Sequence, residues 1–158
     1  MPRHPLPPSF VPFYPRLNLP TENTAPTMTR QIFIHLSTKD VPRAQAFYTS
    51  LGFTRNESFS GENHVCITIS DAIQLMLSAE SAFATFSPRA ICDTSQFLEV
   101  LNCLTCSSRA EVDSLIQKAL QAGGTTVEEA EDHGFMYQHS FLDPDGHAWN
   151  LFHTTGTP

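Results

Sequence analysis

The order of the predicted secondary-structure elements occurs twice in this chain and constrains its fold more than any other feature. Runs rich in β-branched and apolar residues predict strands, and apolar residues at helical spacing predict helices. The first half has a strand over residues 31–37, a helix that opens at 40 and ends at 52, and strands over 54–59, 64–70 and 73–78. The second half repeats this order over 97–106, 109–122, 125–128, 137–142 and 147–153. Two β-α-β-β-β units in one chain indicate an internal duplication.

The predicted fold class is therefore α+β. Two β-α-β-β-β modules, at about 30–78 and 96–153, are expected to form a cupped mixed sheet that surrounds a ligand. The linker between them, 79–95, has helical composition interrupted by Ser87-Pro88. Before the last strand, Asp143-Pro144-Asp145-Gly146 has proline in the second place and glycine in the fourth, which predicts a tight turn.

The N-terminal segment has a different composition from the rest of the chain. Eight of the 12 prolines lie in residues 1–27. Proline fixes φ and lacks a backbone donor, so this segment is expected to form neither a helix nor a central strand. We predict a disordered proline-rich tail over 1–27 and a domain over 28–155. A proline-rich docking ligand is the alternative for the tail, and Met28 is an alternative translation start.

Charge and cysteine content exclude several classes of protein. The 158 residues include 9 Lys and Arg against 16 Asp and Glu, a formal net charge of −7. An acidic surface repels phosphate backbones, so we expect no nucleic-acid partner. No run of about 18 apolar residues occurs, so we expect no membrane partner. Four cysteines do not make a disulfide scaffold, which indicates a reducing, cytoplasmic compartment.

Two motifs connect the repeated pattern with a known family. Residues 39–48 (KDVPRAQAFY), followed by Leu51-Gly52-Phe53, resemble the D-x-x-x-x-x-x-F-Y…L-G-F opening of the vicinal oxygen chelate superfamily. Residues 141–151 (FLDPDGHAWNL) resemble its closing F-x-D-P-D-G-x-x-x-E-L. The superfamily holds glyoxalase I, ring-cleaving dioxygenases, fosfomycin-resistance enzymes and bleomycin-binding proteins. The resemblance covers about residues 30–153 and implies the glyoxalase/bleomycin resistance fold and a homodimer. It does not define the activity, because one fold hosts many chemistries.

The resemblance also implies where a divalent metal would bind. The four ligand positions of the family fall on Phe33, Gln74, Leu101 and Asn150. A phenyl ring and an isobutyl group have no lone pair to donate, and neutral amides are poor ligands for transition metals. We therefore expect no metal and no other cofactor, and we expect these four side chains to line a ligand cup. A divalent metal at a replacement site formed by other histidines is the disfavoured alternative, because no short-range His/Glu pair fixes a geometry.

The histidines are the remaining candidates for chemistry. His35 lies on the same strand face as Phe33, where an imidazole can act as a general base or orient a ligand. A hydrogen-bonded pocket or core histidine is the alternative. His139, on the strand that enters the D-P-D-G turn, is a further candidate for ligand contact. Three others are expected at the surface, in turns or near strand ends: His64, His147 and His153.

Residues 132–137 (DHGFMY) form a polar-to-aromatic loop before the seventh strand. In the structural interpretation, Gly134 supplies an unusual φ while Phe135 and Met136 pack inward. In the functional interpretation, the loop covers the cup, and His133 or Tyr137 contacts the ligand. Six apolar residues are expected in the core: Phe33, Phe135, Met136, Phe141, Trp149 and Phe152.

The pair Cys103 and Cys106 has C-x-x-C spacing, which is typical of redox motifs at helix starts. This pair lies in a predicted strand, where the two side chains point to opposite faces. We therefore expect no redox role.

Three functions are compatible with these observations. The first is a protein that binds a small organic molecule in an apolar cup without a metal. The second is a metal-independent lyase or isomerase that uses His35, with Asn150 or Gln74 donating to a developing oxyanion. The third is a divalent-metal enzyme of the lactoylglutathione lyase or dioxygenase type, which the residues at the ligand positions disfavour. Whether the chain is an enzyme stays open.

Overall fold

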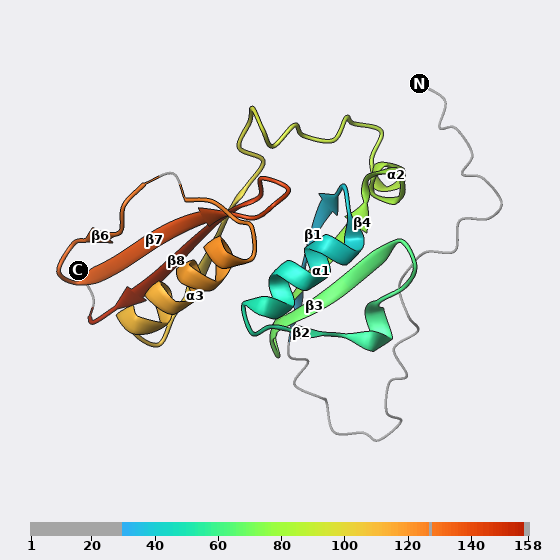
Figure 1. Ribbon diagram of the computed structural model, residues 1–158. Helices are drawn as coiled ribbons and strands as arrows, with labels where there is room; N and C mark the ends of the chain where they lie inside the picture. Colours follow the sequence, from blue (N-terminus) through green and yellow to red (C-terminus); the bar gives the residue numbers. More distant parts are fainter. Residues whose placement is uncertain (1–29, 127, 157–158) are drawn as a thin grey trace, which may run out of the picture.

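A computed structural model describes residues 30–126 and 128–156 (Figure 1). Module 1 contains β1 (Ile32–Thr38), α1 (Val41–Ser50), β2 (Thr54–Arg55), the 3-10 helix η1 (Glu57–Phe59), β3 (His64–Ser70) and β4 (Ile73–Ala79). The short helices α2 (Glu80–Phe83) and η2 (Ala84–Phe86) follow. Module 2 contains β5 (Leu101–Thr105), α3 (Arg109–Gln121), β6 (Glu131–Asp132), β7 (Met136–Leu142) and β8 (Ala148–Thr154). The prediction for the tail, residues 1–27, lies outside the described residues.

Each module forms its own four-stranded mixed sheet. The strand orders are β1-β4-β3-β2 and β5-β8-β7-β6. β1 runs parallel to β4 and β5 parallel to β8, while the other neighbours are antiparallel. Figure 1 shows α1 and α3 on the same side of the two sheets. The predicted α+β fold of two β-α-β-β-β modules is therefore confirmed, with two separate sheets in place of a continuous one.

Local capping signals explain where the two longer helices lie. The side chain of Asp40 accepts a hydrogen bond from the amide of Arg43 at the start of α1. Ser108 accepts in the same way from the amide of Glu111 at the start of α3. These bonds satisfy backbone donors that have no partner inside the helix. Gly52 and Gly123 follow the two helices at φ angles of 103° and 98°, which glycine adopts without a steric penalty.

Three of the predicted strands are shorter than expected. In the run 54–59, only Thr54–Arg55 is a strand, because the side chain of Asn56 accepts from the amide of Ser58 and η1 begins there. In the run 97–106, pairing with β8 begins only at Leu101. In the run 125–128, Thr125 makes an isolated bridge, and the ladder beside β7 is formed by β6 instead.

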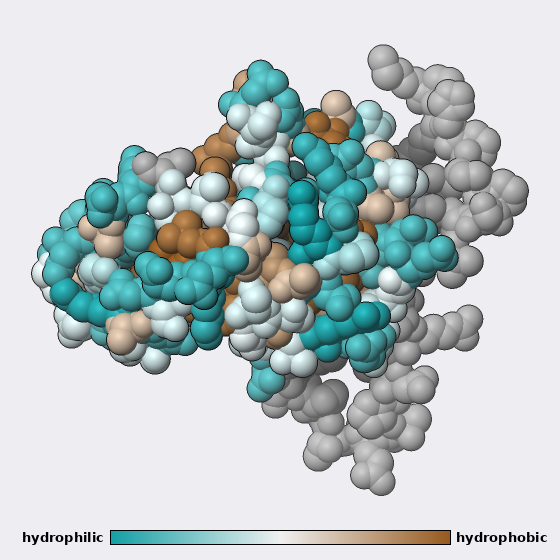
Figure 2. All heavy atoms as spheres, in the orientation of Figure 1, coloured by the Kyte–Doolittle hydropathy of each residue, from teal (hydrophilic) through white to brown (hydrophobic). Residues whose placement is uncertain are grey.

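One hydrophobic core extends through both modules, between the sheets and their helices. Phe47 and Tyr48 of α1 contact the rings of Phe141 and Trp149, with ring centroids 6.0 Å apart in each case. Figure 2 shows hydrophilic side chains over most of the helix-bearing face, with smaller hydrophobic patches. The apolar side chains of α1 and α3 therefore point toward the sheets, and their polar side chains toward water.

The prediction of core residues is only partly right. Phe141 and Trp149 are buried, and Met136 and Phe152 are half-buried. Phe33 and Phe135 are each 40% exposed, so the expectation that they belong to the core was wrong. Phe33 lies on the face of β1 that α1 does not cover, and Phe135 lies in the loop before β7, where it does not pack inward. Gly134 in that loop does have the expected unusual conformation, with φ 82°.

Candidate functional site

The D-P-D-G turn between β7 and β8 ties the two modules together. Asp143 is 5% exposed and accepts hydrogen bonds from the amides of Asp145 and His147, both at 2.9 Å. The phenol of Tyr48 donates to the same carboxylate at 2.6 Å, and the indole of Trp149 donates to the phenol oxygen at 3.0 Å. Burial raises the pKa of the Asp143 carboxyl, which His147 and these hydrogen bonds partly oppose. The two motifs of the sequence resemblance therefore meet in one buried network.

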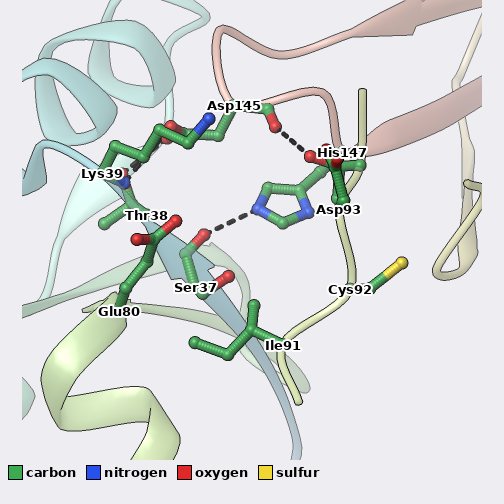
Figure 3. Close-up of a pocket in the computed structure, with 10 residues that line it drawn as sticks. Ser37, Thr38, Lys39, Glu80, Ile91, Cys92, Asp93, Asp145 and His147 are labelled. Carbon is green, nitrogen blue, oxygen red and sulfur yellow. Dashed lines mark hydrogen bonds between the residues drawn. The ribbon is translucent and has the colours of Figure 1, made fainter. Parts of the chain in front are cut away.

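His147 belongs to the same junction. It lies between the turn and β8, as expected, but it is 3% exposed, so the expectation that it lies at the surface was wrong. Its Nε2 lies 2.7 Å from the carbonyl oxygen of Ser37, and its Nδ1 lies 3.1 Å from the carboxylate of Glu99. A carbonyl oxygen only accepts, so Nε2 carries a proton. Figure 3 shows this histidine bonded to Ser37 beside a polar pocket of about 370 Å³, at the end of β1.

A second and larger cleft, of about 480 Å³, lies between the edge strands β1 and β5. Its lining is mainly apolar and includes Ile34 and His35 from β1 and Leu101 and Cys103 from β5. Glu99 is the one charged residue of this lining, and it is bonded to His147. The cleft therefore offers apolar surface from both modules.

The side of each sheet that faces away from α1 and α3 is called the cup face here. Leu36, Leu75 and Leu77 belong to the buried core, so the alternating residues of β1 and β4 point to the cup face. On the first sheet these include Phe33, His35, Gln74 and Ser78. On the second sheet they include Leu101, Cys103 and Asn150, because the neighbouring Trp149 and Leu151 are core residues.

His35 has a defined environment on the cup face. Its Nε2 lies 2.8 Å from the hydroxyl oxygen of Ser78. The rings of Phe83 and Phe86 contact it edge-on, with centroids at 5.0 and 4.8 Å. Burial, and to a smaller extent the nearby His64, lower the pKa of His35 from its usual value of 6.5. His35 is therefore neutral at pH 7 and has one nitrogen lone pair for hydrogen bonding or proton transfer.

The four positions that the family uses for metal ligands all lie on the cup faces, yet the residues present do not fit a divalent metal. Phe33 and Leu101 have no donor atom, and they are 40% and 47% exposed. Gln74 is 4% exposed, and its amide accepts from Thr68 at 2.8 Å and donates to a backbone carbonyl at 3.3 Å. The amide of Asn150 binds Ser140 and Gln138. Within residues 30–126 and 128–156, no group of three or more His, Cys, Asp and Glu side chains could hold a metal ion.

The other three predicted ligand contacts lie away from the cup face. His139 is paired with the core residue Leu151, which places it on the helix side of its sheet, where its ring binds the carbonyl of Glu128 at 3.0 Å. Tyr137 donates to Asp113 of α3 at 2.7 Å. His133, in the loop before β7, lies 3.1 Å from Glu131 and is bonded to no residue of the cup faces. Five candidate residues lie on the cup faces of the two sheets: Phe33, His35, Gln74, Leu101 and Asn150. Of these, His35 and Leu101 line the same cleft.

Sequence reasoning missed two residues of the cup faces. Ser78 was not singled out, because its contact with His35 depends on the register of β1 against β4. Cys103 lies directly opposite Asn150, whereas Leu101 lies opposite Ala148. The alternation of side chains along β5 would have placed Cys103 on the same face as Leu101. Cys103 is exposed and Cys106 is buried, and they are not bonded to each other.

Solved structures share this arrangement. A hypothetical protein from S. aureus has a TM-score of 0.68 at 28% identity, over 79% of this chain and 94% of that one. A glyoxalase/bleomycin resistance protein/dioxygenase family enzyme from Burkholderia phytofirmans PsJN has a TM-score of 0.65 at 21% identity, over 77% and 96%. A glyoxalase-related enzyme from Fulvimarina pelagi has a TM-score of 0.68 at 17% identity, over 83% and 92%. The last two likenesses show the fold alone.

Two β-α-β-β-β modules define the glyoxalase-like class of α+β proteins. In this chain, the D-P-D-G turn of the second module is hydrogen-bonded to the first module through Tyr48. The family model of the Glyoxalase/Bleomycin resistance protein/Dioxygenase superfamily matches residues 30–151, and the chain belongs to this superfamily. None of the curated proteins compared with the chain matches it. Among the described residues, no helix is long and apolar enough to cross a membrane.

Proposed function

We propose that this chain binds a small organic molecule in the cleft between β1 and β5, without the metal of its superfamily. The observation that carries the proposal is an apolar cleft of about 480 Å³ whose lining includes Leu101, a 47% exposed side chain at one of the inherited ligand positions. Phe33, at another of these positions, is 40% exposed on the same face of β1 as the cleft residue His35. Apolar surface that leaves water on binding contributes about 25 cal/mol per Å². The cleft also has the size and apolar character of small-molecule sites.

The test is a thermal-shift screen of small organic compounds against chelator-treated protein. A ligand that binds the folded state raises the unfolding temperature. Leu101→Ala should lose most of the stabilisation by the best compound, because it removes apolar surface from the cleft. Leu120→Ala is the matched control, since Leu120 is also an exposed leucine (39%) but lies on α3. The proposal is wrong if no compound stabilises the protein, or if Leu101→Ala keeps the full stabilisation.

A second candidate is a metal-independent lyase or isomerase that uses His35 as its general base. The 2.8 Å contact between His35 and Ser78 favours it, because it holds a neutral imidazole in one orientation on the cup face. Asn150 is the candidate donor to a developing oxyanion, since its side chain is half-buried whereas Gln74 is only 4% exposed. His35→Gln should abolish turnover of a compound found in the screen while changing its affinity less than threefold. Unchanged turnover would remove this candidate.

We also propose that the chain forms a homodimer. β1 and β5 are edge strands, and two hydrophobic side chains that precede β5, outside the cleft lining, are exposed: Phe97 at 65% and Leu98 at 70%. Unpaired edges and apolar patches of this kind are usually covered in soluble proteins. Sedimentation equilibrium should give twice the chain mass, and Leu98→Glu should shift it toward the monomer. A wild-type monomer at 100 μM would contradict the proposal.

A cytoplasmic location is the last part of the proposal. All four cysteines carry free thiols, including the exposed Cys103, as expected in a reducing compartment. Fractionation of the producing cells, with an antibody against the chain, tests this location.

A further inference from the structure

The longer strands carry no charged residue. β1, β3, β4, β5, β7 and β8 contain no Asp, Glu, Lys or Arg, although the whole chain has 25 such residues. Strand side chains alternate between the two faces, so these six strands bring no formal charge to the core side or to the cup side, apart from histidines. Glu131 of the outer strand β6 lies opposite Gln138 and adds one carboxylate to the cup side. Surface strands of an acidic protein would be expected to carry charges on the face that meets water. The absence of charge from the six longer strands therefore indicates a surface made for an uncharged ligand.

The two carboxylates of the cup face and the cleft lining, Glu131 and Glu99, are bonded within the protein. Glu99, in the cleft lining, lies 3.1 Å from Nδ1 of His147. Glu131, on the outer strand β6, accepts from Gln138 at 2.6 Å and contacts His133 at 3.1 Å. A carboxylate or ammonium group of a ligand would lose water on entering the cup. Among the described residues of the cup faces and the cleft lining, it would meet no unpaired group of opposite charge. That desolvation costs several kcal/mol, whereas an uncharged ligand avoids it.

Aromatic rings surround the first sheet's part of the cup. Phe33 lies 5.3 Å from Phe59, and Phe83 and Phe86 contact His35 at 5.0 and 4.8 Å. Phe33 and Phe86 are 40% and 50% exposed, so these rings have open faces or edges. Aromatic pairs in edge-to-face or offset geometry contribute about 0.5–1.5 kcal/mol beyond area burial. The rings therefore favour a ligand that is itself aromatic.

Neutral hydrogen-bonding groups lie close to these rings. His35 has a ring nitrogen in addition to the one that meets Ser78. On the cup face of the second sheet, the half-buried amide of Asn150 is bonded to Ser140 and Gln138 and has a second N–H that can donate. A neutral carbonyl or amide on a ligand can bond to such groups without a charge penalty.

From the absence of charge, the aromatic rings and the neutral polar groups, we infer that the cup binds an uncharged aromatic molecule that carries a neutral hydrogen-bonding group, such as a carboxamide. This inference rests on the proposed function, because it names the ligand class of the cup faces, which border the same cleft at His35, Leu101 and Cys103. It excludes anionic and cationic ligands of similar shape.

The experiment uses benzamide, benzoate and benzamidine, which share a ring but are neutral, anionic and cationic at pH 7.5. Cyclohexanecarboxamide serves as the non-aromatic control. Titrations followed by ¹H–¹⁵N correlation spectra of the full chain report both affinity and location. Benzamide should shift the amide resonances of β1 and β5 and bind at least tenfold more tightly than benzoate and benzamidine. Cyclohexanecarboxamide should bind about threefold or more weakly than benzamide.

A charge-placing variant tests the same inference in reverse. Leu101→Glu adds a carboxylate to the cleft at a position that is 47% exposed, so the fold tolerates it. It should reverse the preference, so that benzamidine binds more tightly than benzamide. Leu120→Glu on α3 is the control and should keep the preference of the wild type.

The outcomes separate the two proposals. Equal or tighter binding of benzoate or benzamidine to the wild-type cup would overturn the ligand class and leave cleft binding intact. Failure of all four probes, while other compounds stabilise the protein through Leu101, would also overturn the ligand class alone. If neither the probes nor any screened compound occupies the cleft, the proposed function itself is wrong.

Discussion

Tyr48 and Asp143 are 95 residues apart in sequence and are joined by a 2.6 Å hydrogen bond between phenol and carboxylate, at the contact of the two modules. Tyr48 is 1% exposed, and burial followed by the charge of Asp143 raises its pKa well above 10. The phenol therefore stays protonated and donates to Asp143 while it accepts from Trp149. The interaction explains why both motifs of the family lie at the same place in the fold.

Tyr48→Phe should destabilise the protein by about 1–3 kcal/mol. The change leaves the Asp143 carboxylate without one donor and the Trp149 indole without its acceptor, and both groups are buried. Urea unfolding followed by tryptophan fluorescence measures the loss. Tyr137→Phe is the matched control, because its 2.7 Å bond to Asp113 lies at the surface and should contribute about 0.5 kcal/mol or less. Equal losses for the two variants would mean that the buried network does not stabilise the module contact.

Two glycines with similar backbone angles should respond differently to alanine. Gly146 in the D-P-D-G turn has φ 88°, and a Cβ there would lie 3.0–3.2 Å from atoms of Thr94. Gly123 after α3 has φ 98°, with open space around it. Both alanine variants lose about 1 kcal/mol from the unfavourable φ.

Gly146→Ala should lose more than Gly123→Ala, by about 1 kcal/mol, because Thr94 must move away from its 2.5 Å bond with the carbonyl of Asp145. Thermal or urea unfolding of the two variants measures the difference. A smaller loss for Gly146→Ala would show that the turn has more room than the structure indicates.

His35 should make the stability of the protein depend on pH below neutrality. Its pKa is lowered in the folded state, so between the two pKa values the unfolded state binds more protons. Stability should therefore fall as the pH drops through 6.5, with a slope from this group of at most about 1.4 kcal/mol per pH unit. His35→Gln has no such titration and should lose less stability between pH 7.5 and pH 5.5. A variant and wild type with parallel pH profiles would contradict the assignment.

Features set by near neighbours in sequence were the ones that could be predicted. The caps at Asp40 and Ser108 act on amides three residues ahead, and the D-P-D-G turn closes on itself through Asp143. Such bonds form wherever the local sequence occurs, so the helices and turns were expected in the right places. The early end of β2 was not expected. The side chain of Asn56 accepts a hydrogen bond from the amide of Ser58, and this local bond competes with continued strand pairing.

Features that depend on a distant partner could not be predicted. His147 is buried because its ring reaches the carbonyl of Ser37, 110 residues earlier in the chain. Cys103 lies next to Asn150 only through the register of β5 against β8. The exposure of Phe33 depends on which face of β1 receives α1, since a phenyl ring alone favours burial. A correct prediction for His139 and Tyr137 needs to know which face of β7 carries each side chain. Hydropathy does not indicate this face when the residues of a strand are polar and half-buried.

Removal of divalent metals should change neither stability nor ligand binding. The family's ligand positions carry Phe33 and Leu101, which cannot coordinate an ion, and Gln74 and Asn150, whose amides are bonded within the protein. Elemental analysis of the purified protein should find well under one divalent metal per chain, before and after treatment with a chelator. The unfolding temperature and the stabilisation by the best screened compound should agree within about 1 °C between the two samples. A stoichiometric metal that the chelator removes, together with a loss of ligand binding, would contradict the prediction. That result would place a metal among side chains other than the four inherited positions.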